Sequence, residues 1–194
     1  MRTVFVDVDT QLDFLFPAGA LYVPGAERIL PALGQLNRYA EAHGIPLLST
    51  ADAHAENDPE FAAWPPHCVA GTLGQRKPAA TLLENRAVIP NREASTAFDR
   101  ASQYIVEKQT IDVFETKTVR RVLDLLWADR YVVYGVVTEI CVISAVRGLL
   151  EPGKQVVVVA DAIQALSAAK AAQALEEIRG VGGSITTTGE ILAA

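Results

Sequence analysis

Cys141 is the residue of this chain whose chemistry depends most on its surroundings. It lies in TEICVISAVRGLL (138–150), directly after the apolar run YVVYGVV (131–137). The run predicts a buried strand and the next residues a helix, so the thiol falls in the helix's first turn. Free N–H groups there favour a thiolate and can receive an oxyanion. Cys141 is therefore a candidate nucleophile, with an ordinary core cysteine as the alternative.

A nucleophilic thiol needs a proton acceptor and a charge partner. Asp9 follows the apolar strand-like segment RTVFVDV (2–8), and Lys108 ends the segment YIVEK (104–108). Carboxyl ends of parallel strands meet at one edge of a sheet, so we expect both side chains to face the crevice there. The alternatives are a turn or cap role for Asp9 and a solvated surface position for Lys108. Asp13 is one candidate for such a structural role, in which its carboxylate accepts hydrogen bonds from loop N–H groups.

The polar stretch DAHAENDPEFAAWPPHC (52–68) could hold a metal ion. Asp52 and His54 are two residues apart, a spacing that lets both side chains point the same way from an extended segment. His67 follows later, with Glu60 between. Two imidazoles with one or two carboxylates suit a divalent transition metal such as Zn, Fe or Mn. The alternative is a polar loop without a metal.

These residues must be positioned by an alternation of strands and helices. Strands are expected at 2–8, 45–51, 87–90, 104–108, 131–137 and 155–162, with a last strand and tail at 184–192; helices are expected at 26–42, 117–129, 138–150 and 167–182. Near-continuous apolar strands between helices predict an α/β fold, a single three-layer α/β/α domain over residues 1–194 with a mainly parallel sheet. Residues 52–80 form a loop long enough to be functional. His43 ends the first helix and is expected at the surface.

Composition narrows the function classes. The chain has 194 residues, of which 50% are hydrophobic, and a net charge of −6. This balance is typical of a globular protein and argues against nucleic acid as a partner. No apolar run reaches the roughly 18 to 20 residues of a membrane span. The start of the chain does not have the pattern of a signal peptide. We therefore expect a cytoplasmic protein with no membrane partner, in which Cys68 and Cys141 are free thiols.

Four motifs together resemble those of the isochorismatase-like cysteine hydrolases, most closely the nicotinamidases (pyrazinamidases). They are VDVDTQLDF, WPPHCVAGTLG, VEKQTIDVF and GVVTEICV, which occur in the family's order along nearly the whole chain. The resemblance implies that Asp9, Lys108 and Cys141 are the catalytic residues. It also implies a cis peptide bond before Val137, whose N–H would join that of Cys141 in an oxyanion hole.

The same resemblance implies how a substrate would be held. Phe14 and Trp64 would enclose the substrate ring, although core packing is the alternative for Phe14. One divalent metal ion, Zn or else Fe or Mn, would orient the pyridine nitrogen. Its implied ligands are Asp52, His54, Glu60 and His67, with Asp58 as the competitor of Glu60.

The implied reaction is deamidation of nicotinamide to nicotinate and ammonia through a cysteine thioester, a step of pyridine nucleotide salvage. The nearest alternative is a related cysteine amidase acting on an N-carbamoyl compound, a ureido acid or maleamate. A non-catalytic binding protein of the same fold is a third reading. Isochorismate hydrolysis is disfavoured because enzymes with that activity do without the cysteine. Members of such families range from monomers to tetramers, so a homo-oligomer is compatible with the resemblance.

Overall fold

A computed structural model gives the structure of residues 1–92 and 100–193. In this part of the chain one sheet has the strand order β3-β4-β2-β1-β5-β6-β7, and every neighbouring pair is parallel. The strands are β1 (Thr3–Val8), β2 (Leu47–Asp52), β3 (Arg86–Ile89), β4 (Gln103–Lys108), β5 (Arg130–Val136), β6 (Gln155–Gln164) and β7 (Ser184–Thr186). The predicted parallel sheet is confirmed.

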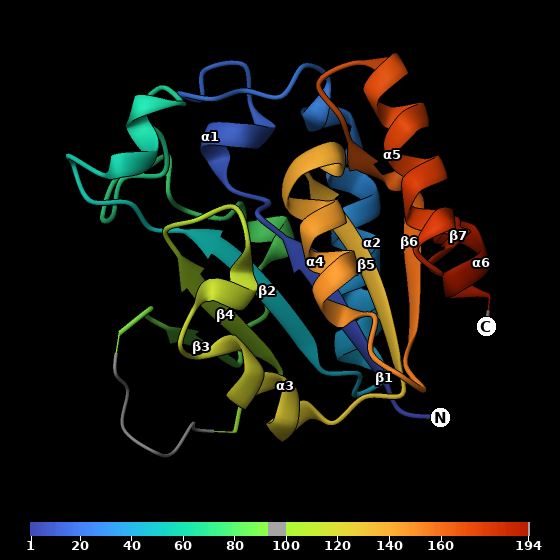
Figure 1. Ribbon diagram of the computed structural model, residues 1–194. Coiled ribbons are helices and arrows are strands. Elements are labelled where there is room, and N and C mark those ends of the chain that lie inside the picture. The colour runs from blue at the N-terminus through green and yellow to red at the C-terminus, as the bar shows by residue number, and fades with distance from the viewer. Residues whose placement is uncertain (93–99, 194) are drawn as a thin grey trace.

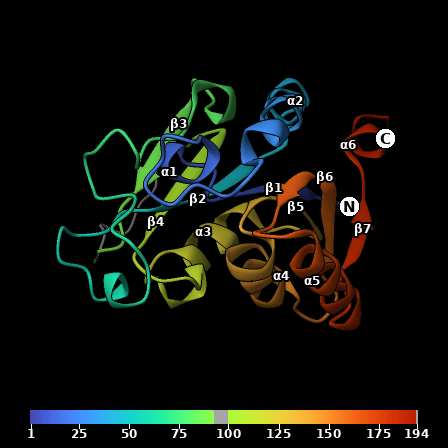
Figure 2. The same ribbon diagram turned by 90° about the horizontal axis from the view of Figure 1, so that it is seen from above.

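Helices cover both faces of the sheet, as Figures 1 and 2 show. They are α1 (Leu12–Leu15), α2 (Leu30–Ala42), α3 (Val119–Leu126), α4 (Ile143–Leu149), α5 (Ala168–Gly180) and α6 (Thr188–Leu192). In the view from above, α2 and α6 lie on one side of the sheet and α3, α4 and α5 on the other (Figure 2). The molecule thus has the three predicted α/β/α layers, with the apolar strands buried between them.

The central strand shows why the sequence folds in this way. β1 has five of its six residues buried, because helices cover it from both faces. Phe5 stacks on Tyr39 of α2 at a ring distance of 6.3 Å and meets the edge of Tyr134 of β5 at 6.1 Å. α2 buries Leu33 and Leu36 completely, at the spacing expected for one face of a helix.

The structure corrects several predicted boundaries. The predicted helix 138–150 begins as a π-helical turn (Thr138–Val142) before α4. The predicted last strand and tail, 184–192, is a strand only to Thr186. Thr187 then caps α6 in a reciprocal capping box with Glu190, which ends the strand and starts the helix. The short helix α1 lies in a segment expected to be a loop.

The connections place a crevice beside β1. From β1 the chain moves to β2 on one side of it, and β5 later joins its other side. β1 and β5 therefore flank the point where the strand order reverses, the usual ligand position in open parallel sheets. In Figure 1, α1 and the loop after β2 lie above the carboxyl ends of these strands.

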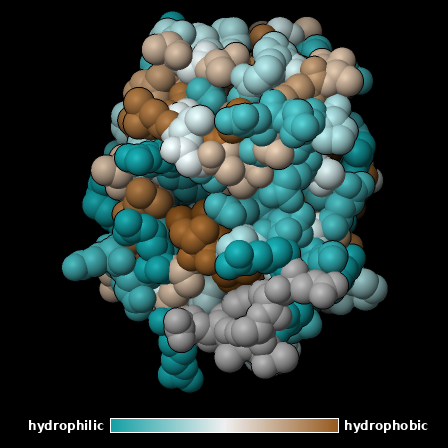
Figure 3. Space-filling model, turned by 90° about the vertical axis from the view of Figure 1, so that its left-hand side faces the viewer, coloured by the Kyte–Doolittle hydropathy of each residue, from teal (hydrophilic) through white to brown (hydrophobic). Residues whose placement is uncertain are grey.

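The two edge strands, β3 and β7, are short, with four and three residues. Short edges limit pairing with other chains. The face on the β3 side shows mainly hydrophilic residues with small, separate hydrophobic areas (Figure 3). In the part of the chain that the structure describes, none of the helices is both long and apolar enough to cross a bilayer.

Candidate active site and metal centre

The three candidate catalytic residues meet at the carboxyl edge of the sheet. Lys108 Nζ lies 3.0 Å from Asp9 Oδ2 and 3.9 Å from Cys141 Sγ. It also contacts Asp52 Oδ1. Asp52 and Lys108 are register partners on the neighbouring strands β2 and β4, so their side chains leave the sheet together. One buried ammonium thus binds two carboxylates and touches the thiol.

Burial and the charges within this cluster together set the pKa of each group. Burial alone would lower the pKa of Lys108, but the Asp52 and Asp9 carboxylates hold it well above its ordinary range. Burial raises the pKa of Asp9, and Lys108 only partly opposes this. For Asp52 the balance is reversed: burial is outweighed by Lys108 and by the two neighbouring histidines, so its pKa is lowered. The site therefore holds one firmly ionised carboxylate and one, Asp9, that accepts a proton more readily.

The thiol of Cys141 differs from expectation in its pKa. Cys141 lies in the π-helical turn and is partly exposed, while Cys68 is buried, and neither forms a disulfide. Burial of its sulfur raises the pKa of the Cys141 thiol well above its ordinary value, and Lys108 only partly offsets this. Contrary to the predicted stabilisation of a thiolate, these surroundings favour the neutral thiol. A base must remove the proton when the sulfur reacts, and Asp9 is in place for this.

The end of β5 brings the turn of Cys141 close to β1. Gly135 has a φ of 118°, and a Cβ atom there would lie 2.1 Å from the carbonyl oxygen of Val8. Only glycine allows this approach. The peptide bond between Val136 and Val137 is cis, as predicted. Val137 and Cys141 both line the pocket described below.

A candidate metal centre adjoins this cluster. Among the described residues, the ligand atoms of Asp52, His54 and His67 lie within 4.8 Å of one another, and all three residues are buried. Asp52 Oδ2 is 3.8 Å from His54 Nε2 and 3.7 Å from His67 Nε2. The other oxygen of Asp52 binds Lys108, so this carboxylate links the metal centre to the catalytic cluster.

The surroundings of the two histidines fit a cation. His67 Nδ1 lies 2.8 Å from the carbonyl oxygen of Pro65, which would fix the proton on Nδ1 and leave Nε2 free as a ligand. His54 is fully buried, and neither of its ring nitrogens has an aligned hydrogen-bond partner in the described residues. The Nε2 atom of His54 lies 3.8 Å from Asp52 Oδ2, too far for a hydrogen bond, and a divalent ion between them would satisfy this buried nitrogen.

The two competing carboxylates have different positions. Asp58 Oδ2 lies 3.1 Å from Nδ1 of His54, the side of the ring away from Asp52. From this position Asp58 would not bind the metal ion itself but would orient the imidazole of His54, which would bind it. Glu60 lines the pocket, and burial together with the charge of Asp52 raises its pKa. Glu60 is not in the group of three that lies within 4.8 Å, so its predicted role as a ligand stays a prediction.

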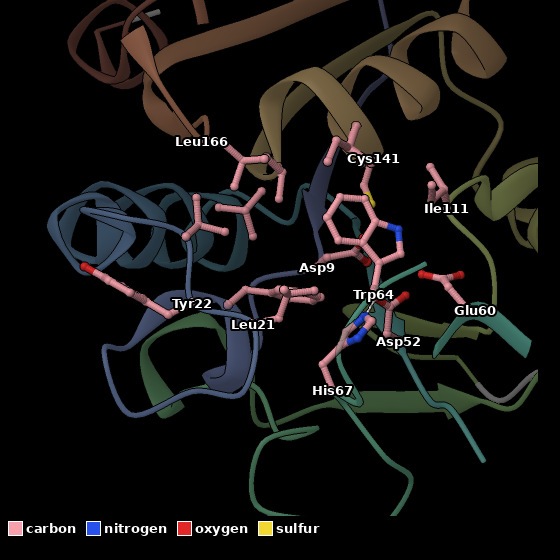
Figure 4. A pocket seen from close by; sticks show the side chains of 15 residues that line it. Asp9, Leu21, Tyr22, Asp52, Glu60, Trp64, His67, Ile111, Cys141 and Leu166 are labelled. Carbon is pink, nitrogen blue, oxygen red and sulfur yellow. Dashed lines mark ion pairs between the residues drawn. The ribbon is translucent and has the colours of Figure 1, made fainter. Parts of the chain in front are cut away.

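A pocket of about 500 Å³, open at its mouth, joins both centres. Figure 4 shows Asp52, Glu60 and His67 together on one side of Asp9, and Leu21, Tyr22 and Leu166 on the other. The predicted ring-binding residues, Phe14 and Trp64, both line this pocket. Phe14 is also 95% buried in the core, and its ring centre lies 5.4 Å from that of His67. The position of Phe14 is therefore compatible both with the predicted contact to a substrate ring and with core packing, the alternative.

Other residues support the site without touching the pocket. Gln11 is fully buried and binds the backbone of Asp52 on both sides, donating to its carbonyl oxygen at 2.8 Å and accepting from its N–H at 2.7 Å. Asp13 accepts bonds from Ala20 N–H and Cys68 N–H, the structural role predicted for it. The sequence placed Gln11 at this edge of the sheet, directly after the first strand, but gave no indication of its role.

Several solved structures share this fold. The pyrazinamidase of Pyrococcus horikoshii, solved in complex with zinc, superposes with a TM-score of 0.81 at 27% identity, over 96% of this chain and 99% of that one. An isochorismatase-like hydrolase from Alkaliphilus metalliredigens superposes with a TM-score of 0.82 at 21% identity, over 100% of this chain and 98% of that one. N-carbamoylsarcosine amidase from Thermoplasma acidophilum superposes with a TM-score of 0.77 at 21% identity, over 97% of each chain.

The two likenesses at 21% identity establish the fold alone. A search of curated protein sequences gave no match. The family model described as the isochorismatase domain, however, matches residues 3–190. Since this is nearly the whole chain, the protein belongs to the isochorismatase-like hydrolase family.

Proposed function

We propose that this protein is a cysteine amidohydrolase that converts nicotinamide to nicotinate and ammonia. The observation that carries the proposal is the buried ammonium of Lys108, within 3.0 Å of the Asp9 carboxylate and 3.9 Å of the Cys141 thiol. This group lies at a largely apolar pocket beside an Asp-His-His cluster. A strongly perturbed, charge-paired cluster at a pocket is typical of a catalytic site.

In the proposed mechanism, Cys141 attacks the carboxamide carbon while Asp9 takes the thiol proton. The carbonyl oxygen, now negative, is received by the N–H groups of Val137 and Cys141. Asp9 returns its proton to the amide nitrogen, the C–N bond breaks and ammonia leaves. Water then cleaves the thioester with Asp9 as base, which releases nicotinate and the free thiol. Burial raises the pKa of Asp9, and the Lys108 ammonium partly offsets this and so favours the ionised carboxylate in the resting site.

Phe14 and Trp64 would hold the flat ring, and the metal centre would fix its orientation. Asp52, His54 and His67 are the residues that would hold a divalent ion, with Glu60 as a further candidate. Such an ion, when bound, supplies a Lewis-acidic anchor for the ring nitrogen. Two imidazole nitrogens with one or two carboxylates suit Zn, Fe or Mn.

The charges that line the pocket support a neutral substrate over an anionic one. Asp9, Asp52 and Glu60 line it, whereas its lining, all within the described residues, includes no lysine or arginine. The nearby charge of Lys108 is already engaged by two carboxylates. Maleamate, ureido acids and N-carbamoyl amino acids each carry a carboxylate, which the carboxylates of this lining would repel and which no lysine or arginine of the lining would pair with. A neutral amide such as nicotinamide fits the pocket better.

Ammonia release tests the proposal. The metal-loaded protein is incubated separately with nicotinamide, maleamate and an N-carbamoyl amino acid, and the metal content of the same sample is measured. We expect turnover of nicotinamide, little of the anionic amides and none with Cys141→Ala. Preference for an anionic amide would favour the related amidase. Absence of ammonia from all three would favour a binding protein, and wild-type turnover by Cys141→Ala would exclude the proposed nucleophile.

A further inference from the structure

The side chain of Thr50 makes an unusual pair of contacts with Asp9. Thr50 lies in β2, two residues before Asp52, and is 99% buried. Its hydroxyl accepts a hydrogen bond from the backbone N–H of Asp9 at 3.1 Å. The same hydroxyl donates to Asp9 Oδ1 at 2.6 Å. One oxygen atom therefore fixes both the backbone and the carboxylate of a single residue.

The backbone of Asp9 needs such a contact. β1 ends at Val8, and Asp9 has a φ of 49°, in the left-handed region that residues other than glycine adopt infrequently. This turn directs the Asp9 N–H to the neighbouring strand β2, where Thr50 receives it. The hydroxyl thus satisfies a buried N–H that would otherwise have no partner after the strand ends.

The second contact leaves the other carboxylate oxygen of Asp9 to pair with Lys108. Oδ1 is engaged by Thr50, whereas Oδ2 lies 3.0 Å from Lys108 Nζ. Among the described residues, buried Oδ2 has no aligned hydrogen-bond donor. Lys108 also touches the thiol of Cys141, so Oδ2 and the sulfur share the same ammonium as a neighbour. Rotation of the carboxylate would break the Thr50 bond.

We propose that Thr50 is a positioning residue, whose hydroxyl holds the Asp9 carboxylate in the orientation that receives the Cys141 proton. It touches neither thiol nor pocket and acts only through Asp9. Proton transfer requires donor and acceptor at hydrogen-bond distance, so a carboxylate free to rotate would transfer the proton less often. The role rests on the proposed cysteine chemistry and is independent of which amide is the substrate.

Two variants separate the hydroxyl from the rest of the side chain. Thr50→Val keeps the branched shape and removes the hydroxyl, whereas Thr50→Ser keeps the hydroxyl and removes the methyl group. A hydrogen bond to a charged group corresponds to about a ten- to hundredfold effect. We expect Thr50→Val to lower kcat by this factor with KM within about threefold, and Thr50→Ser to stay close to wild type. If Thr50→Val does not fold, Thr50→Ala replaces it; melting curves establish folding.

A second readout does not need the substrate. Iodoacetamide alkylates a thiol as its proton is removed, and mass spectrometry distinguishes Cys141 from the buried Cys68. At pH 7 we expect slower alkylation of Cys141 in Thr50→Val than in Thr50→Ser. Equal alkylation in both, or wild-type kcat in Thr50→Val, would overturn the positioning role. If wild type leaves nicotinamide intact while alkylation still depends on the hydroxyl, only the substrate assignment fails.

Discussion

The buried charge of Lys108 can be removed to test the whole cluster. Lys108→Met keeps an unbranched side chain of similar length but leaves Asp9 and Asp52 without their shared cation. Both carboxylates are almost completely buried, at 1% and 3% exposure, so water does not replace the lost partner. Removing one member of a buried ion pair costs about 3–5 kcal/mol. For a protein of this size that corresponds to a fall in melting temperature of about 6–20 °C.

The loss should depend on pH with a definite sign. Burial already raises the pKa of Asp9 above its ordinary 3.8, and loss of Lys108 raises it further. A carboxyl group whose pKa is higher in the folded state stabilises the fold below its unfolded pKa. That contribution is lost as the pH rises through the folded pKa. The difference in stability between wild type and Lys108→Met should therefore be smallest near pH 4 and largest at pH 8.

Urea unfolding followed by circular dichroism at pH 4, 6 and 8 measures this difference. Lys170→Met is the matched control, since Lys170 is exposed on α5 and its loss should change stability by less than about 0.5 kcal/mol. The reasoning is refuted if Lys108→Met is as stable as Lys170→Met at pH 8, or if its deficit grows towards pH 4. Either result would mean that the ammonium does not neutralise buried carboxylates.

Three further outcomes are expected. His54→Ala should lower the content of bound divalent metal from about one per chain to near zero, whereas the exposed His43→Ala should leave it unchanged; equal metal in both would exclude the metal centre. The kcat/KM for nicotinamide should fall on the acid side with a midpoint above 3.8, because burial raises the pKa of Asp9 and only its ionised form accepts the thiol proton; a flat profile down to pH 4 would contradict this. Gly135→Ala should destabilise the protein by about 2 kcal/mol or more, since its Cβ would lie 2.1 Å from backbone, while Gly153→Ala meets no atom within 4 Å and should cost less in the same melts.

The sequence predicted the layers of the fold because its strands are apolar on both faces. Runs such as residues 131–137 are apolar at almost every position, which is typical of a strand covered on both faces. The polar residues that follow these runs then indicate the functional edge of the sheet. The π-helical turn of Cys141 could not be predicted, since α and π turns share the same apolar pattern over five residues. The start of α6 was readable from Thr187 and Glu190, but the threonine run favoured a strand.

The sequence predicted which residues belong to the candidate site, but not all of the contacts between them. Lys108 was expected beside Asp9, but its shared contact with Asp52 depends on the register of β2 and β4, which no local pattern encodes. Thr50 gave no signal, because a threonine in a strand is ordinary. Asp58 and Glu60 could not be separated by spacing; only the folded loop shows that Asp58 lies behind His54.

The central claim is that the sulfur of Cys141 bonds to the acyl carbon of the amide. Acid quenching during turnover of nicotinamide, followed by peptide mass spectrometry, tests this directly. The account predicts a nicotinoyl thioester on the peptide that contains Cys141 and an unmodified peptide containing the buried Cys68. Ammonia released with no acyl group on Cys141 at any quench time, and undiminished in Cys141→Ala, would contradict it.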